Sequence, residues 1–67
     1  MLNELFINKR NVEVVKVIEV PEGRNSVKGL YLTGPHAGEW RAIAKNFLYP
    51  LEKAYNETPL DKFKKFL

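Results

Sequence analysis

The stretch YLTGPHAGEWRAIAKNFLYP, from Tyr31 to Pro50, decides the fold because it joins two apolar runs through the densest group of turn formers in the chain. It also holds the only Trp and the only His among the 67 residues. Gly34 and Gly38 can adopt the positive φ that tight turns need, and Pro35 presets φ to about −65° at the second turn position. Residues 34–38 therefore predict a tight β-hairpin turn.

The run EWRAIAK, which follows this turn, predicts a strand whose inward face carries Trp40, Ala42 and Ala44. Small residues at the centre of a tightly curled sheet leave room for bulky ones opposite, so Ile43 is expected to point outward. The next run, NFLYPL, predicts a turn followed by a short return strand or a 3₁₀ segment, because Pro50 excludes a central strand. The core residues expected in this part of the chain are Phe47, Leu48 and Leu51.

The run NVEVVKVIEV, residues 11–20, predicts another strand, because β-branched residues at this density favour a pleated strand over a helix. Val14 and Val15 are adjacent, so either a bulge shifts the register or both faces of the strand are covered. A polar loop and the strand VKGLYLTG follow, with a bend or bulge expected at Gly29. An N-terminal strand is expected from about Leu5, although a single turn of helix fits the same residues.

The C-terminal run TPLDKFKKFL predicts a helix over residues 58–67, with Thr58 as its N-cap and Pro59 at its first position. Its apolar face would carry Leu60, Phe63 and Leu67, with Phe66 at the edge. A helix this short is unstable alone in water, so it must dock, and the outward face carrying Ile43 and Tyr31 is its expected seat. The preceding run EKAYNE tolerates a helix, but no pattern in it requires one.

The length and composition indicate one small domain. At 67 residues, folding buries only about 60% of the chain's surface, and such a core rarely supplies more than roughly 3–5 kcal/mol of net stability. The chain has no Cys and one His, which excludes disulfides and a structural zinc site. The absence of Cys fits a reducing interior, and neither a basic-then-apolar leader nor an apolar run of about 20 residues is present, so we expect a soluble cytoplasmic protein.

The charge balance weakly favours a polyanionic partner. Eleven Lys and Arg against eight Asp and Glu leave a net charge of +3, with a pI near 9.3. No catalytic constellation is visible, because His36 is the only imidazole and the chain has no thiol. In GPHAG the second Gly is followed by Glu39 and Trp40 instead of Lys and Ser or Thr, so it is no phosphate loop. We therefore expect no enzyme, no cofactor and no metal.

The segment TGPHAGEW followed by RAIAKNFLYPLE resembles the small SH3-like barrel, and within it the KOW-type module. Trp40, Arg41 and Ala42 are similar to the SH3 strand that opens with Trp and reaches an inward Ala two residues later. The resemblance covers roughly Val12 to Leu51 and rests on short, turn-dominated motifs. Two features depart from the module: no further Gly follows shortly after the turn, and a C-terminal helix is added. The resemblance implies a mainly β, antiparallel barrel of four or five strands with that helix packed on it.

The same resemblance implies a binding module that contacts RNA, DNA or other proteins through its loops and one sheet edge. Carried onto this chain, its phosphate-facing residues would be His36, Arg41 and Lys45. Charge alone adds Arg24, Lys28 and either Lys9 or Arg10. Such contacts position a nucleic acid without reading its bases, and each makes the affinity fall with salt.

Two aromatic side chains, Tyr31 and Trp40, could stack on an unpaired base for about 1–3 kcal/mol if they are exposed. The favoured expectation for Trp40 is burial, because a lone Trp in so small a core is usually its central hydrophobe. The alternative function is a protein-interaction module, such as a small phage-type inhibitor or adaptor of a host protein, which would present an apolar patch or a sheet edge. A homodimer is compatible with either function, since it would cover a strand edge.

Overall fold

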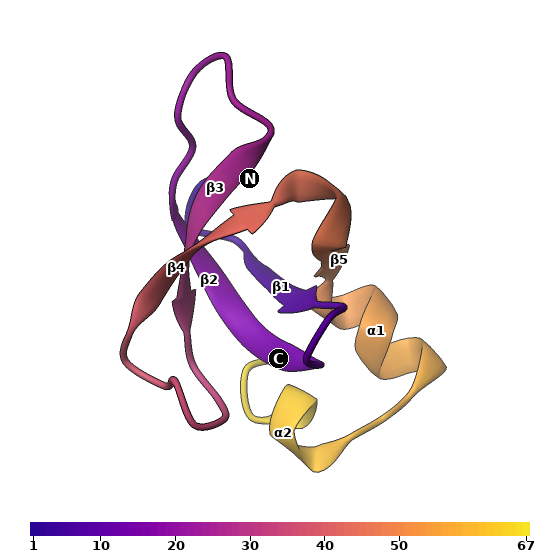
Figure 1. The fold of residues 1–67 in the computed structure, drawn as a ribbon. Coiled ribbons are helices and arrows are strands. Elements are labelled where there is room, and N and C mark those ends of the chain that lie inside the picture. Colours follow the sequence, from indigo (N-terminus) through magenta and orange to yellow (C-terminus); the bar gives the residue numbers. More distant parts are fainter.

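The computed structural model describes all 67 residues. Five antiparallel strands form one sheet in the order β4-β3-β2-β1-β5 (Figure 1). The strands are β1 (Leu5–Asn8), β2 (Glu13–Glu19), β3 (Ser26–Tyr31), β4 (Trp40–Ala44) and β5 (Leu48–Pro50). A 3₁₀ helix, η1 (Lys45–Phe47), precedes β5, and the helices α1 (Leu51–Glu57) and α2 (Asp61–Lys64) follow it. The expected mainly β fold with a short helix packed on it is confirmed, and the sheet is open between β4 and β5.

The turn predicted at residues 34–38 joins β3 to β4, and both of its glycines adopt positive φ, 84° at Gly34 and 89° at Gly38. The backbone N–H of Gly38 donates to the carbonyl of Tyr31 over 2.9 Å, which closes the hairpin. Because β1 to β4 follow one another as antiparallel neighbours, their turns alternate between two ends of the sheet (Figure 1). The β1–β2 and β3–β4 turns therefore lie at one end, and the β2–β3 turn lies at the other.

Strand β2 is covered on both faces, and it also contains a bulge, so both explanations of its broken alternation apply. Val14 and Val15 are each fully buried, at 0% exposure, although they point to opposite faces. The register with β3 shifts between Val17 and Glu19, which leaves Ile18 without a partner. Strand β1 begins at Leu5 as expected, and residues 46–51 form the end of η1, then β5, and enter α1.

The prediction for the two faces of β4 was wrong. Ile43 is 4% exposed and belongs to the inner cluster, which we define as Val15, Tyr31 and Ile43. Trp40 is 53% exposed and lies on the other face. The reason is volume: a Cβ on Gly29 would lie 2.6 Å from Ile43 Cδ1, so the missing side chain of Gly29 makes the space that Ile43 fills. Gly29, which was expected to bend β3, thus leaves the space that the Ile43 side chain of β4 occupies.

The predicted start of the C-terminal helix was also wrong. Thr58 ends α1, where its N–H donates to the carbonyl of Ala54, and its extended backbone is the conformation that the following Pro59 favours. The undetermined run EKAYNE is helical and lies in α1. The second helix, α2, spans only Asp61–Lys64, and no side chain caps it. Leu67, expected on its packing face, is 59% exposed.

Both helices cover the face of the sheet opposite to the one predicted. The outer cluster, which the helices form with β1 and β2, consists of Ile7, Val14, Leu51, Ala54 and Phe63. Ile43 and Tyr31, the expected seat, lie on the other face in the inner cluster. The helices therefore do not cover the face that carries the inner cluster, and the pocket described next lies on this face.

Candidate functional site

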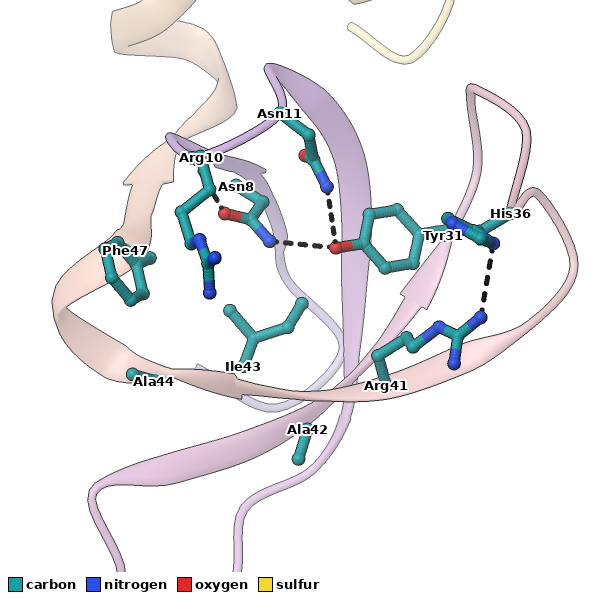
Figure 2. Close-up of a pocket in the computed structure, with 10 residues that line it drawn as sticks. All are labelled: Asn8, Arg10, Asn11, Tyr31, His36, Arg41, Ala42, Ile43, Ala44 and Phe47. Carbon is teal, nitrogen blue, oxygen red and sulfur yellow. Dashed lines mark hydrogen bonds between the residues drawn. The ribbon is translucent and has the colours of Figure 1, made fainter.

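A pocket of about 480 Å³ lies where the β1–β2 turn, the β3–β4 turn, β4 and η1 converge (Figure 2). Its polar lining residues are Asn8, Arg10, Asn11, Tyr31, His36 and Arg41. Ile43 and Phe47 form its apolar floor and wall. The topology explains the assembly, because the turns on either side of the β2–β3 hairpin lie at the same end of the sheet. We call this hollow the polar pocket.

The Tyr31 hydroxyl is held inside the polar pocket by two amides. Asn8 Nδ2 donates to Tyr31 Oη over 2.8 Å, and Asn11 Nδ2 donates to it over 3.0 Å (Figure 2). The orientation of both amides follows from their oxygens, which accept the backbone N–H of Arg10 at 3.0 Å and of Glu13 at 3.2 Å. Tyr31 is 5% exposed, yet no protein acceptor takes its own hydroxyl hydrogen. The Tyr31 hydroxyl therefore accepts two hydrogen bonds and keeps its own hydrogen available to the pocket.

Two guanidinium groups flank this phenol, and they differ in their surroundings. Arg41 donates to Glu39 Oε1 over 2.9 Å and contacts His36 Nδ1 at 3.2 Å. Because a guanidinium only donates, His36 Nδ1 is the acceptor in that contact. Arg10 has no carboxylate partner, and its guanidinium carbon lies 5.5 Å from the centroid of the Phe47 ring. Arg10 is thus the free cation of the polar pocket, while the charge of Arg41 is partly balanced.

The five basic residues predicted to form one surface lie in three places. His36 and Arg41 meet in the polar pocket. Arg24 belongs to the β2–β3 turn at the opposite end of the sheet, and Lys45 lies near it, since its N–H donates to the carbonyl of Asn25 over 2.7 Å. Lys28 lies on the outer face, where its Nζ is 3.4 Å from Glu19 Oε1 and 4.5 Å from the centroid of the Trp40 ring.

The two stacking candidates differ in accessibility. Trp40, expected to be buried, is exposed and carries Lys28 on its ring. Tyr31 is buried, and its hydroxyl is directed at the amides of Asn8 and Asn11 in the polar pocket (Figure 2). Sequence reasoning missed the amides of Asn8 and Asn11. Their only signal is the placement of two Asn residues at either side of a short turn, and that pattern is as common in plain turns.

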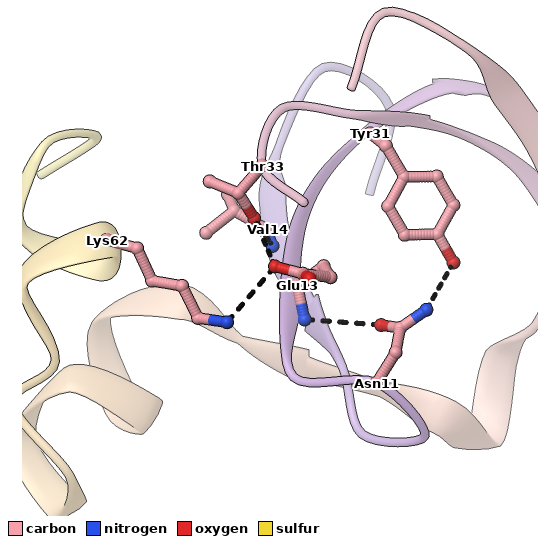
Figure 3. Close-up of polar contacts among 6 residues, drawn as sticks. All are labelled: Asn11, Glu13, Val14, Tyr31, Thr33 and Lys62. Atoms are coloured by element: carbon pink, nitrogen blue, oxygen red, sulfur yellow. Dashed lines mark hydrogen bonds and ion pairs between the residues drawn. The ribbon is translucent and has the colours of Figure 1, made fainter. Parts of the chain in front are cut away.

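A polar network outside the pocket ties α2 to the sheet (Figure 3). Glu13 Oε1 accepts from Thr33 Oγ1 at 2.7 Å and from Lys62 Nζ at 3.1 Å, and Thr33 Oγ1 also accepts the N–H of Val14 at 2.9 Å. Burial by itself raises the pKa of Glu13, but the hydrogen bonds from Thr33 and Lys62 and the charge of Lys62 together lower it. Glu13 is therefore a charged anchor between the β1–β2 turn and the C-terminal helix.

A second hollow, of about 510 Å³, is mostly apolar and lies between the β1–β2 turn, β5 and the two helices. Its rim includes Val12 and Leu60, which are 42% and 38% exposed. Val12 has φ of 60°, a left-handed conformation that strains a β-branched residue. The Tyr49 hydroxyl, on the same rim, donates to Glu57, and this bond raises the pKa of Tyr49.

No group of three or more His, Asp or Glu residues is placed to hold a metal ion. The helices are all too short and too polar for any of them to cross a bilayer. Comparisons with protein-family models, with curated proteins and with solved structures find no match to this chain. Its function must therefore be inferred from the polar pocket and from the outer face around Trp40.

Proposed function

We propose that this chain is a non-enzymatic, SH3-like module of the KOW type that binds single-stranded nucleic acid at the polar pocket. The observation that carries the proposal is the convergence of Arg10, Arg41 and a Tyr31 hydroxyl whose own hydrogen is not donated within the protein, in one hollow of about 480 Å³. That volume lies within the range of small-ligand sites, so the hollow can admit one nucleotide.

The fold supports the proposal as far as architecture can. The first four strands run as an antiparallel meander, and the fifth returns to pair with the first, which is compatible with the SH3-like resemblance. The polar pocket is built from the 34–38 turn and its neighbours, which is where the resemblance implies the binding loops lie. One fold can host many functions, so the chemistry of the pocket has to carry the proposal.

The chemistry of the pocket suits one nucleotide of a single strand. Arg10 and Arg41 can each contact a phosphate, because guanidinium groups match the geometry of phosphate oxygens. Phe47 supplies an aromatic surface, and in its present position it already carries the Arg10 guanidinium. A base that entered between the Phe47 ring and the Arg10 guanidinium would stack on the ring and gain a cation–π contact with the guanidinium. The bases of a duplex are stacked and paired inside the helix, so an unpaired base fits the hollow better.

Binding is proposed instead of catalysis because no acid–base pair faces the hollow. None of the residues that line the polar pocket is an Asp or Glu, and His36 Nδ1 already contacts Arg41. The one carboxylate nearby, Glu39, is 56% exposed and paired with the same guanidinium. A general base needs an acceptor atom that is free to take a proton from a substrate, and both Glu39 and His36 are already engaged with Arg41.

Fluorescence anisotropy with labelled single strands at about 50 and 200 mM salt tests the proposal. The affinity of the wild type should fall as the salt concentration rises. Arg10→Ala and Arg41→Ala should each make the slope of log K against log[salt] less steep, by about 0.7 for every phosphate that the removed side chain had neutralised. Lys64→Ala is the matched control, since Lys64 is exposed on α2, across the sheet from the pocket. Absence of binding at the lower salt, or an equal loss with Lys64→Ala, would refute the proposal.

A second candidate function rests on the outer face. Trp40 is the largest exposed hydrophobic side chain in the chain, at 53% exposure, and Lys28 covers part of its ring. Exposed Trp residues are enriched at the centres of protein interfaces, so this face suits a protein partner. Capture from a cell lysate with nuclease present, using the wild type and Trp40→Ala, separates the two. A stoichiometric partner that survives nuclease and is lost with Trp40→Ala would favour the protein-interaction module.

A further inference from the structure

The polar pocket offers many hydrogen-bond donors and few acceptors. The amide oxygens of Asn8 and Asn11 already accept backbone N–H groups, and their nitrogens are directed at Tyr31 Oη. The phenol has accepted twice, so what it has left is its own hydrogen. Arg10 and Arg41 add guanidinium N–H groups, which donate only. A ligand that reaches the Tyr31 hydroxyl must therefore present an acceptor to it.

The depth of this donor within the pocket decides which part of a nucleotide it meets. Tyr31 is 5% exposed, whereas Arg10 and Arg41 lie at the rim and are exposed (Figure 2). A nucleotide whose phosphate is held at the rim directs the far edge of its base inward. In a pyrimidine, position 4 lies opposite the nitrogen that carries the sugar. Thymine and uracil have a carbonyl oxygen there, whereas cytosine has an amino group.

We propose that the polar pocket selects keto bases over amino bases, with the Tyr31 hydroxyl donating to the carbonyl at the far edge of the bound base. This inference rests on the proposed binding of single-stranded nucleic acid. An amino group in the same place would set donor against donor, and the base itself would keep water from the Tyr31 hydroxyl, so that both the hydroxyl and the base amine would stay unpaired. The two amides hold the phenol in place, so it cannot turn away from a mismatched base.

The test compares two oligonucleotides of equal length and charge, one of thymidine and one of 5-methyldeoxycytidine, by anisotropy with the wild-type protein at neutral pH. The two bases share the methyl group and differ at position 4 and at the protonation of the adjacent ring nitrogen. Thymidine should bind about fivefold more tightly or better. Equal affinities that both fall with salt would overturn the selectivity and leave the proposed function standing. Absence of binding to either strand would overturn both.

The Tyr31→Phe variant tests whether the hydroxyl causes the selectivity. Without the hydroxyl, the ratio of the thymidine affinity to the 5-methyldeoxycytidine affinity should fall to near one. Tyr49→Phe is the matched control, because Tyr49 lies on the rim of the apolar hollow and its hydroxyl donates to Glu57, so the ratio should not change. A ratio that survives Tyr31→Phe would show that another group reads the base. If Tyr31→Phe fails to fold, a strand of 4-thiothymidine serves with the wild type: its sulfur is the weaker acceptor, so the affinity should fall below that of thymidine.

Discussion

Gly29→Ala combined with Ile43→Val examines why Ile43, and not Trp40, faces the interior. Gly29 has no positive φ, so the backbone itself would accept Ala, and Ala would ordinarily stabilise a strand interior by roughly 0.5–1 kcal/mol relative to Gly. The added Cβ, however, would lie 2.6 Å from Ile43 Cδ1, where ordinary van der Waals contact is 3.4–4 Å. Ile43 is 4% exposed, and moving its Cδ1 away from the new Cβ and into the polar pocket would loosen its packing in the inner cluster. Steric overlap should therefore reverse the sign.

The expected magnitudes follow from this contact. Gly29→Ala should lower the free energy of unfolding by about 1–3 kcal/mol, the range for overpacking a core. Ile43→Val alone should cost about 0.5–1.5 kcal/mol, because it removes the buried Cδ1 methyl. The Val variant lacks the atom that the new Cβ meets, so the double variant should be more stable than the sum of the two losses predicts, by about 1 kcal/mol.

Urea unfolding, monitored by circular dichroism, gives the free energy of unfolding of all three variants. The dependence of this free energy on urea concentration should equal that of the wild type if unfolding stays two-state. A destabilised Gly29→Ala that is partly rescued by Ile43→Val supports the observed packing. Strict additivity, or a Gly29→Ala variant more stable than the wild type, would contradict it. Either result would mean that Ile43 does not occupy the space beside Gly29.

Three further predictions concern residues away from this contact. Trp40→Ala should lower the free energy of unfolding by less than about 3 kcal/mol, the least that truncation of a fully buried Trp costs, because the side chain is 53% exposed; a larger loss in urea would indicate a buried Trp. Val12→Gly should raise the melting temperature, because relief of the left-handed strain is worth about 1–2 kcal/mol while little buried area is removed; a lower melting temperature would show that Val12 contributes packing. The lowered pKa of Glu13 means that its contribution to stability is present above its ordinary pKa of 4.5 and is lost as the pH falls through the lower folded value. Glu13→Gln should therefore flatten the fall in stability of the wild type below pH 4.5, and an unchanged pH profile would contradict the network with Thr33 and Lys62.

The strands could be predicted from the sequence because their signals are local. The glycines and proline of the 34–38 turn specify a hairpin, and the β-branched run of β2 excludes a helix. The faces of β4 could not be predicted in this way. One face of the strand carries Trp40 with two small Ala residues, and the other carries Ile43 between two basic residues. Each face thus has one large apolar side chain, and the pattern does not decide which of them is buried. The choice depends on Gly29, which lies in another strand and leaves a space that only an aliphatic side chain fills.

The candidate site was predicted only in part, for the same reason. His36 and Arg41 are close in sequence and meet at 3.2 Å, so a local argument could pair them. The role of Asn8 depends on Tyr31, which lies 23 residues further along the chain. No spacing rule links a turn amide to a tyrosine across two strands, and only the register of β1, β2 and β3 brings them together.

The most direct test of the binding site is an amide nitrogen–proton correlation spectrum of the protein, recorded by NMR while a thymidine oligonucleotide is added. Binding in the polar pocket should move the side-chain amide signals of Asn8 and Asn11, and the indole signal of exposed Trp40 should stay in place. Movement of the Trp40 indole with both amide signals unchanged would contradict the account, because it would place the nucleic acid on the other face of the sheet.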